Sequence, residues 1–308
     1  MKNIRIEKKN SNERIDKFLA KEIFLNGKMT RGEIIRQIKS GNVLVNGIKI
    51  KPSYILKEGD GVEVDIAKKN AEIMPNEDIK LKIIFQDKNI IAINKPAGLQ
   101  VHPDFHEKNN TLVNGLIEKF PEIKTVGDEP SVRPGIVHRL DRDTSGVMIV
   151  ARNQKTFLSL KQKFKDRDVT KKYLALVYGK LERKRGTIEK PIARAGNYKK
   201  QIIAGKKTKT KVRRAVTEYE VTSEFNGFSL AEVFPKTGRT HQIRVHLASI
   251  GHPIVGDDKY GLKNIIPDKR AKRQLLHAGQ LSFELKGKKY DLTSPMPEDM
   301  FRFIDCLD

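Results

Sequence analysis

The sequence has a single cysteine and no long apolar run, and these absences exclude several classes of protein. Cys306 alone cannot form an internal disulfide or a thiolate cluster for zinc, which is typical of a reducing compartment. No apolar run approaches the roughly 20 residues that span a bilayer, and residues 1–10 lack the apolar core of a signal peptide. We therefore expect a cytoplasmic protein, whose 308 residues are enough for a main domain and an additional one.

Acidic residues are few relative to basic ones. The 38 Asp and Glu are outnumbered by 61 Lys and Arg, so the formal net charge is +23 at pH 7. Such a surface attracts polyanions, of which nucleic acid and anionic lipid are the two candidates. Because no basic amphipathic helix with a wide apolar face stands out, we expect nucleic acid and no membrane as the partner.

The motifs of nucleotide and metal cofactors are missing. Neither GxGxxG nor GxxxxGKS/T occurs, so a phosphate-binding loop for a nucleotide is not expected. His241 and His246 are five residues apart on a predicted strand, and His102 and His106 lie in a loop with proline. Because catalytic zinc needs three convergent ligands, we expect neither a metal nor a cofactor.

Residues 1–66 have the pattern of a small separate unit. A capping box at Thr30–Glu33 starts a second helix, and Asn46–Gly47 is a strong hairpin signal between two short strands. The first helix is predicted from apolar residues at helical spacing: Ile15, Phe18, Leu19 and Ile23. The sequence thus predicts a small α/β domain over residues 1–66, followed by a linker over residues 67–80, where the periodicity is lost.

Residues 81–308 have a mixed pattern of many strands and few helices. Asn153 is expected to cap a helix whose Phe157, Leu160 and Phe164 share one face. Because strands and helices do not alternate strictly, the pattern favours an α+β fold with a mixed sheet. The predicted strands cover residues 82–85, 90–96, 146–151, 173–179, 216–225 and 229–235.

The segment 180–214 differs from its surroundings in composition. It holds 14 Lys or Arg and only two acidic residues, Glu182 and Glu189. We expect it to leave the sheet, where it is either solvated or binds phosphate.

The stretch HRLDRDTSG, residues 138–146, precedes the apolar run VMIV. If its first part is extended, Arg139 and Asp141 share one face, whereas Asp143 and the residues after it form a turn. A carboxylate in the extended part has no local backbone to cap, so Asp141 is the candidate for chemistry and Asp143 for the turn. A capped turn without any chemistry is the alternative from the spacing alone.

A second dense stretch covers residues 238–261. We predict a strand over residues 237–247, with one face formed by Thr240, Gln242, Arg244 and His246. Such a face is expected either to border a cleft or to be solvated. Arg244 would there be able to pair with Asp141 and hold it ionised.

Tyr173 alternates with Ala175 and Val177 on an otherwise apolar strand. Its ring is therefore expected either to fill the core or, beside a carboxylate and an arginine, to stack on a nucleobase.

Four motifs of the sequence resemble those of the RluA/RluD family of ribosomal RNA pseudouridine synthases. They are KPAGLQVHP at 95–103, HRLDRDTSG at 138–146, GRTHQIRVH at 238–246 and LLHA at 275–278. The N-terminal unit, with RIDKFL, TRGEI and GNVLVNG, resembles an S4 RNA-binding domain. The resemblance implies a mixed-sheet catalytic domain over residues 81–308, structured RNA as substrate, and neither metal nor cofactor.

The resemblance also assigns residues to the site. It implies that Asp141 is the catalytic aspartate, Tyr173 the active-site tyrosine and Arg244 the basic partner of the carboxylate. Arg139 would fill the space left by the everted base, and Leu276 would form an apolar wall against it. For the S4-like unit we assign Arg31 and Lys39 to RNA binding.

Several functions remain open at this point. The leading prediction is isomerisation of uridine to pseudouridine in 23S ribosomal RNA by a monomer, and a transfer RNA is the alternative substrate within the family. A non-catalytic RNA-binding or ribosome assembly factor would also explain the charge and the S4-like unit. A hydrolase that uses Asp141 and Asp143 as a carboxylate pair is disfavoured, because its basis in the motif is weak.

Overall fold

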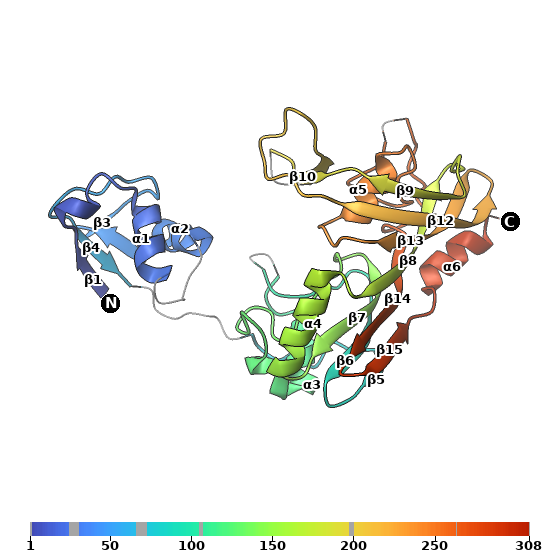
Figure 1. The fold of residues 1–308 in the computed structure, drawn as a ribbon, viewed down its shortest axis with the longest axis horizontal. Coiled ribbons are helices and arrows are strands. Elements are labelled where there is room, and N and C mark those ends of the chain that lie inside the picture. The colour runs from blue at the N-terminus through green and yellow to red at the C-terminus, as the bar shows by residue number, and fades with distance from the viewer. Residues whose placement is uncertain are drawn as a thin grey trace. The chain divides into compact units, whose positions relative to one another are not determined.

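A computed structural model describes residues 2–24, 31–65, 73–104, 107–196, 200–262 and 264–307 of the chain (Figure 1). Backbone contacts divide the chain into two compact units, Met1–Glu72 and Ile73–Asp308. No helix in the described ranges is long and apolar enough to cross a membrane.

The boundary between the units falls inside the segment predicted as a linker, residues 67–80. Residues 73–80 belong to the larger unit, because Ile73 is buried in its core and the Asn114 side chain donates to the Met74 carbonyl at 2.7 Å. The loss of periodicity therefore marks an irregular segment held by side-chain hydrogen bonds. The rest of the predicted linker lies outside the described residues.

The smaller unit combines two helices with a four-stranded antiparallel sheet of order β1-β4-β2-β3. Asn46 and Gly47 have φ of 51° and 74°, as the two central residues of a tight hairpin require. Thr30 of the predicted capping box and the side chain of Ile23 lie outside the described residues. The elements are β1 (Lys2–Arg5), α1 (Ile15–Phe24), α2 (Arg31–Ser40), β2 (Val43–Val45), β3 (Ile48–Lys49) and β4 (Gly61–Val64).

The core of this unit follows the predicted helical spacing. Ile15, Phe18 and Leu19 of α1 are at most 2% exposed and pack with Ile34 and Ile38 of α2. Strand β1 is not predicted, because its short alternation resembles that of a charged terminal segment.

The larger unit is built on a mixed sheet of nine strands among the described residues. Its order is β5-β6-β7-β14-β8-β13-β12-β9, and β15 pairs with β14. The mixed sheet and its few helices confirm the predicted α+β class. Its strands are β5 (Ile83–Gln86), β6 (Ile90–Lys95), β7 (Ser145–Ala151), β8 (Thr170–Tyr178), β9 (Arg185–Glu189), β12 (Val216–Phe225), β13 (Phe228–Pro235), β14 (Leu276–Leu285) and β15 (Lys288–Thr293).

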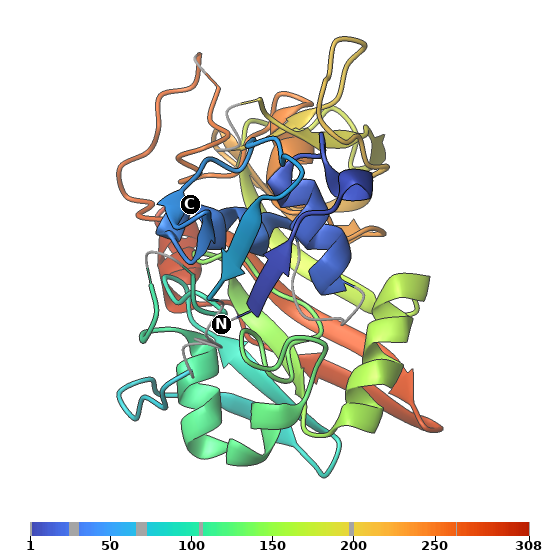
Figure 2. The same ribbon diagram turned by 90° about the vertical axis from the view of Figure 1, so that its left-hand side faces the viewer.

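Strand β7 lies between two helical layers. Alternate residues of its apolar run enter two cores: Met148 and Val150 pack with α3, whereas Val147 and Ile149 pack with α4. Figure 2 shows these helices on either side of the sheet. Asn153 caps α4 as predicted, since its side chain accepts from the Thr156 N–H at 2.9 Å. The helices of this unit are α3 (Leu112–Lys119), α4 (Gln154–Asp166), α5 (Gln242–Ala248) and α6 (Glu298–Asp305).

The strand predicted over residues 237–247 is wrong. Residues 242–248 form α5, because Ile243 and Leu247 lie one helical turn apart and both enter the core formed with β12 and β13. In a helix that is buried on all sides, polar and apolar residues can alternate as they do in a strand. The alternation in this stretch therefore did not distinguish a helix from a strand.

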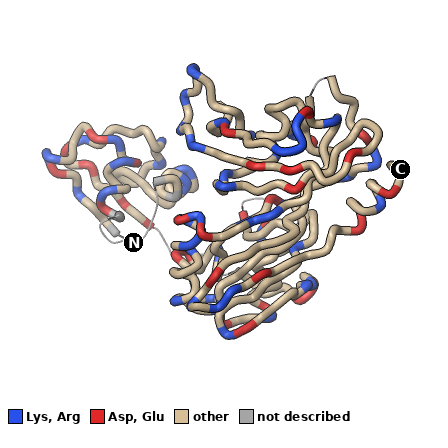
Figure 3. Tube along the Cα trace, turned by 45° about the vertical axis from the view of Figure 1, so that its right-hand side comes forward, with Lys and Arg blue, Asp and Glu red and all other residues tan. Residues whose placement is uncertain are grey.

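The basic segment 180–214 leaves the sheet only in part. Strand β9 pairs with β12 and is the edge of the large sheet, whereas β10 (Ile192–Arg194) and β11 (Gln201–Ile203) form a separate hairpin. Figure 3 shows Lys and Arg recurring along the loop that projects near β10.

His138 supports the middle of β7. Its Nε2 accepts a hydrogen bond from the Ile149 N–H at 3.0 Å, and its ring stacks on Phe164 with centroids 4.7 Å apart. Burial lowers the pKa of His138 to about 3, and the charge of Lys171 acts in the same direction. The neutral ring is therefore part of the fold.

We predict that alanine at Gly146 destabilises the larger unit. Gly146 has φ of 117°, and a Cβ there would collide with the backbone of Ala278 on the neighbouring parallel strand. Gly146→Ala is expected to lower the free energy of unfolding by about 2–4 kcal/mol. Gly205→Ala is the control, because nothing lies within 4 Å of its Cβ position. Urea denaturation checks this, and equal midpoints for the two variants would contradict it.

A second prediction concerns acid stability. Below its ordinary pKa of 6.5, His138 is protonated in the unfolded chain but stays neutral in the native state down to about pH 3. Stability is therefore lost as pH falls through this window, by up to about 1.4 kcal/mol per pH unit for this group. In His138→Gln, whose amide oxygen still accepts from the Ile149 N–H, we expect a shallower loss. Unfolding free energies of both proteins at pH 4.5 and 6.5 test this, and parallel profiles would exclude it.

Candidate active site

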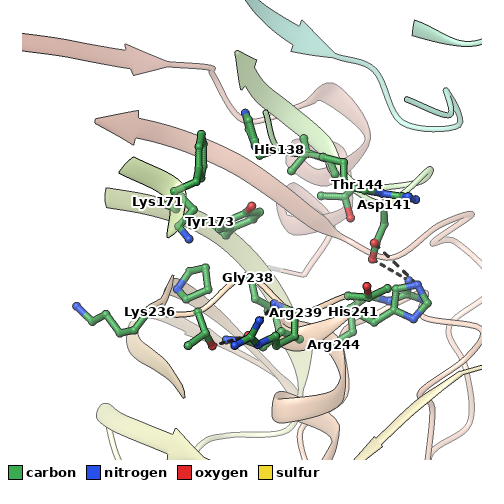
Figure 4. A pocket seen from close by; sticks show the side chains of 18 of the residues that line it. His138, Asp141, Thr144, Lys171, Tyr173, Lys236, Gly238, Arg239, His241 and Arg244 are labelled. Carbon is green, nitrogen blue, oxygen red and sulfur yellow. Dashed lines mark hydrogen bonds and ion pairs between the residues drawn. The ribbon is translucent and has the colours of Figure 1, made fainter. Parts of the chain in front are cut away.

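A cavity of about 580 Å³ opens beside the turn that follows Asp141 (Figure 4). Its lining comes from the segment before β7, from the end of α4 with the start of β8, from residues 235–244, and from Leu276 of β14. Among the described residues that line it, Asp141 is the only acidic one. Chain segments far apart in the sequence thus meet around one carboxylate.

Arg244 joins Asp141 to a second aspartate. Its Nη1 donates to Asp141 at 3.2 Å, while its Nε and Nη2 donate to the two oxygens of Asp257 at 2.7 and 2.8 Å. The predicted pairing of Arg244 with Asp141 is therefore present. The Asp257 side chain is fully buried, whereas that of Asp141 is 21% exposed and faces the cavity. Asp257 fixes the guanidinium, and Asp141 is left accessible to a ligand.

The Asp257 carboxylate is itself held by the chain that follows it. One of its oxygens also accepts from the Lys259 and Tyr260 N–H groups at 3.0 and 3.1 Å. The Tyr260 ring lies over the Arg244 guanidinium, 5.1 Å from its carbon. Burial alone would lower the pKa of Arg244, but the hydrogen bonds and charges of the two aspartates raise it above its ordinary value. The guanidinium is permanently charged in this setting.

His241 lies on the other side of Asp141. Its Nε2 is 3.9 Å from the carboxylate, and its Nδ1 is 2.7 Å from the Tyr260 hydroxyl. Burial lowers the pKa of His241 more than the nearby Asp141 raises it, so the ring is neutral near pH 7. His241 is the N-cap of α5, and its φ of 54° lies in the left-handed region. His241 thus contributes shape and a hydrogen bond, and no second positive charge.

Buried cations hold the turn after Asp141. The Lys95 ammonium donates to the Arg142 carbonyl at 2.8 Å, and Arg273 donates to the Asp143 carbonyl at 3.1 Å. The other acceptors of Lys95 are the carbonyls of Pro96 and Leu99. Burial lowers the pKa of Lys95 to about 7, although Asp143 and Asp141 act to raise it. Lys95 of the KPAG motif therefore supports the turn after Asp141.

Tyr173 and Leu276 form an apolar side of the cavity. Tyr173 lies on β8, and Leu276 lies on the adjacent β14, where it pairs with Ala175. Burial, together with the charge of Asp141, raises the pKa of the Tyr173 phenol above its ordinary value, so the ring stays neutral. In Figure 4 the Tyr173 ring points into the cavity that Asp141 borders.

The structure brings together five of the seven predicted site residues: Arg139, Asp141, Tyr173, Arg244 and Leu276. The other two belong to α2 of the smaller unit. Lys39 is exposed there, and Arg31 is the first residue of the helix, but its side chain is not among those that the structure describes. Asp143 is absent from the cavity lining and lies in the turn, as predicted for it. A hydrolytic carboxylate pair of Asp141 and Asp143 therefore has no basis here.

Sequence reasoning missed Asp257, Tyr260, His241 and Lys95 as parts of the site. The acidic pair in GDDKYG, residues 256–261, was a signal for the first of them, since it follows the Arg244 motif closely. No group of three or more His, Cys, Asp or Glu side chains that could hold a metal ion occurs among the residues described.

The sequence matches two family profiles. Residues 89–249 match the RNA pseudouridylate synthase family, and residues 13–62 match the S4 domain. The first match contains the cavity residues from Arg139 to Arg244.

Individual proteins resemble this chain over most of its length. The protein "Uncharacterized RNA pseudouridine synthase YlyB" of Bacillus subtilis is 38% identical over 297 residues, which cover 96% of this chain and 94% of that protein. "Ribosomal large subunit pseudouridine synthase D" of Xanthomonas campestris is 37% identical over 306 residues, covering 96% and 88%.

The fold has a solved counterpart in a human protein, "RNA Pseudouridylate Synthase Domain Containing 1". The two structures superpose with a TM-score of 0.60 at 27% identity, over 76% of this chain and 96% of the human one. Together with the matching family profile and the relatives, this shows that the chain belongs to the RNA pseudouridylate synthase family and is an RNA pseudouridine synthase with an S4 domain.

Proposed function

We propose that this enzyme isomerises uridine in large-subunit ribosomal RNA and that Asp141 is its catalytic residue. The observation that carries the second part is the position of Asp141, the sole carboxylate in the lining of a cavity and fixed there by Arg244. The RNA target is supported by relatives from Xanthomonas campestris and Zymomonas mobilis, both named ribosomal large subunit pseudouridine synthase D. Such a substrate supports a cytoplasmic location, and we propose that the enzyme acts there as a monomer.

The reaction exchanges one glycosidic bond for another. The bond between uracil N1 and ribose C1′ breaks, the base turns, and C5 bonds to C1′; a proton leaves C5 and one is gained at N1. Atoms and electrons balance without a redox partner. Asp141 serves either as nucleophile at C1′ or as the base that removes a sugar proton, and both routes require it to be ionised. Arg244 orients this carboxylate through a charge-assisted hydrogen bond of 3.2 Å.

The other cavity residues act on the base. The target nucleotide must be extruded from the folded RNA, which costs a few kcal/mol. Tyr173 would stack on the freed uracil, Leu276 would border it, and Arg139, an exposed residue at the rim, would take its place in the RNA. The S4 domain, through Arg31 and Lys39, would add a second hold on structured RNA.

Removing the Asp141 carboxylate is expected to abolish the reaction. In Asp141→Asn the pseudouridine formation rate should fall by about 10³-fold or more, because the amide can neither attack C1′ nor accept a sugar proton. Asp143→Asn is the matched control, since Asp143 does not line the cavity, and it should keep the rate within about threefold. An undiminished rate in the Asp141 variant would show that another residue carries the reaction.

Asp257 is expected to act through Arg244. Asp257→Asn loosens the guanidinium that faces Asp141, so the single-turnover rate should fall by about 10–100-fold, while RNA affinity changes little. Asp258 also lies near Arg244, 3.7 Å from its Nη2, but it is 80% exposed and its charge is screened by solvent, so Asp258→Asn should stay within about twofold. Equal rates for the two variants would show that the orientation of Arg244 does not matter.

The RNA target is tested by mapping pseudouridine in total RNA from cells with and without this protein. We expect sites in large-subunit ribosomal RNA to disappear in the deletion strain. Loss of transfer RNA sites alone would overturn this part of the proposal and leave the activity intact.

A further inference from the structure

The cavity has a large excess of positive charge. Seven of its 22 lining residues are Lys or Arg, against the single acid Asp141. They are Arg139, Lys165, Arg167, Lys171, Lys236, Arg239 and Arg244. Arg244 is neutralised by aspartates, and Lys236 pairs with Glu218 at 2.9 Å.

Three of the remaining cations lie near one another without an acidic partner among the described residues. Burial lowers the pKa of Arg239, and the nearby charges of Arg213 and Arg167 lower it further. Burial likewise lowers the pKa of Lys171, with Arg167 acting in the same direction. Lys171 and Arg239 are half-buried, and unpaired charges in such positions are unfavourable. The fold therefore keeps a repulsive cluster that an anion would relieve.

Arg167 also occupies a strained backbone position. It follows α4 as its C-cap with φ of 66° and ψ of 26°, a conformation that favours glycine and costs other residues about 1 kcal/mol. The helix dipole does not require this charge, because Lys163 and Lys165 already lie in the last turn of α4. Neither the backbone conformation nor the helix dipole therefore requires an arginine at this position.

The Arg239 guanidinium is oriented but not saturated. Its Nε donates to the Arg214 carbonyl at 3.2 Å, which holds the group in place. Its Nη1 and Nη2 have no acceptor in the part of the chain that the structure describes. Figure 4 shows Lys171 beside Tyr173, and Arg239 across the cavity from them. The cluster thus borders the space in which the uracil would lie.

We propose that Arg167, Lys171 and Arg239 form a phosphate-binding site for a backbone phosphodiester next to the target uridine. The inference rests on the proposed role of Asp141, because a nucleotide whose ribose faces Asp141 is covalently linked to two flanking phosphates. A guanidinium group can donate two parallel hydrogen bonds to the oxygens of one phosphate, and the ammonium group of a lysine adds a compact positive charge. The site would hold the extruded nucleotide by its backbone while the base turns.

The wild-type enzyme is first incubated with total RNA of the deletion strain, and the uridines that it modifies are mapped. A short RNA that contains one of these uridines is the substrate for the test. Arg239→Gln and Lys171→Gln should each weaken RNA binding by about tenfold and make the dependence of log affinity on log salt shallower by about one. The rate at saturating enzyme should change by less than about threefold. Lys236→Gln, which lines the same cavity but loses a charge already paired with Glu218, should change neither quantity by more than about twofold.

A neutral methylphosphonate at each flanking position in turn identifies the contacted phosphate. The wild-type enzyme should bind the RNA with a methylphosphonate at that position about tenfold more weakly than the unmodified RNA. Arg239→Gln should bind the two RNAs with nearly the same affinity. Additive losses at both positions would show that Arg239 does not contact either phosphate.

Arg167→Gly separates binding from folding. It should raise the unfolding midpoint, because glycine accepts the left-handed conformation, and yet weaken RNA binding. Variants that bind RNA with wild-type affinity and salt dependence, while the wild-type enzyme forms pseudouridine, would overturn the phosphate site alone. If the wild-type enzyme modifies no RNA, or if Asp141→Asn retains full activity, the proposed function fails instead.

Discussion

The site depends on one buried guanidinium shared between two carboxylates. Arg244 is 4% exposed, so its charge must be compensated inside the protein, and Asp257 does this with two hydrogen bonds. Only the third nitrogen of the guanidinium reaches Asp141. This division of labour keeps the cation in place while the Asp141 carboxylate stays open to the cavity. Because α5 is buried on nearly all sides, packing against its neighbours fixes the helix that carries Arg244.

Buried or partly buried cations also hold the turn that follows Asp141. Strand β7 is buried along its full length between two cores, so its start is a fixed point. Lys95 and Arg273 then bind the carbonyls of the two residues that follow Asp141. These cations hold the backbone of the turn, whereas Arg167, Lys171 and Arg239 in the cavity lining have no acidic partner among the described residues. The contrast between paired and unpaired cations distinguishes groups that build the site from groups available to RNA.

Much of the fold was predictable because it depends on local patterns. The hairpin at Asn46–Gly47, the cap at Asn153 and the apolar strand after residue 145 all appear as predicted. The stretch around Arg244 failed, because apolar residues at both strand and helix spacing occur in a fully buried segment. Asp141 and Arg244 nevertheless meet as expected, since their pairing follows from charge and not from the type of element that carries Arg244.

The sequence alone determined the chemical inventory: a basic chain, one candidate carboxylate in HRLD, an arginine to pair with it, and a tyrosine on an apolar strand. Local signals also sufficed for the two-part organisation, since turns, caps and periodicity act over a few residues. Only the tertiary structure decided that Asp257 orients Arg244, that Lys95 holds the turn after Asp141, and that Arg167, Lys171 and Arg239 meet around one cavity. These relations join residues far apart in the chain, and no short-range pattern encodes which buried charges share a partner and which are left without one.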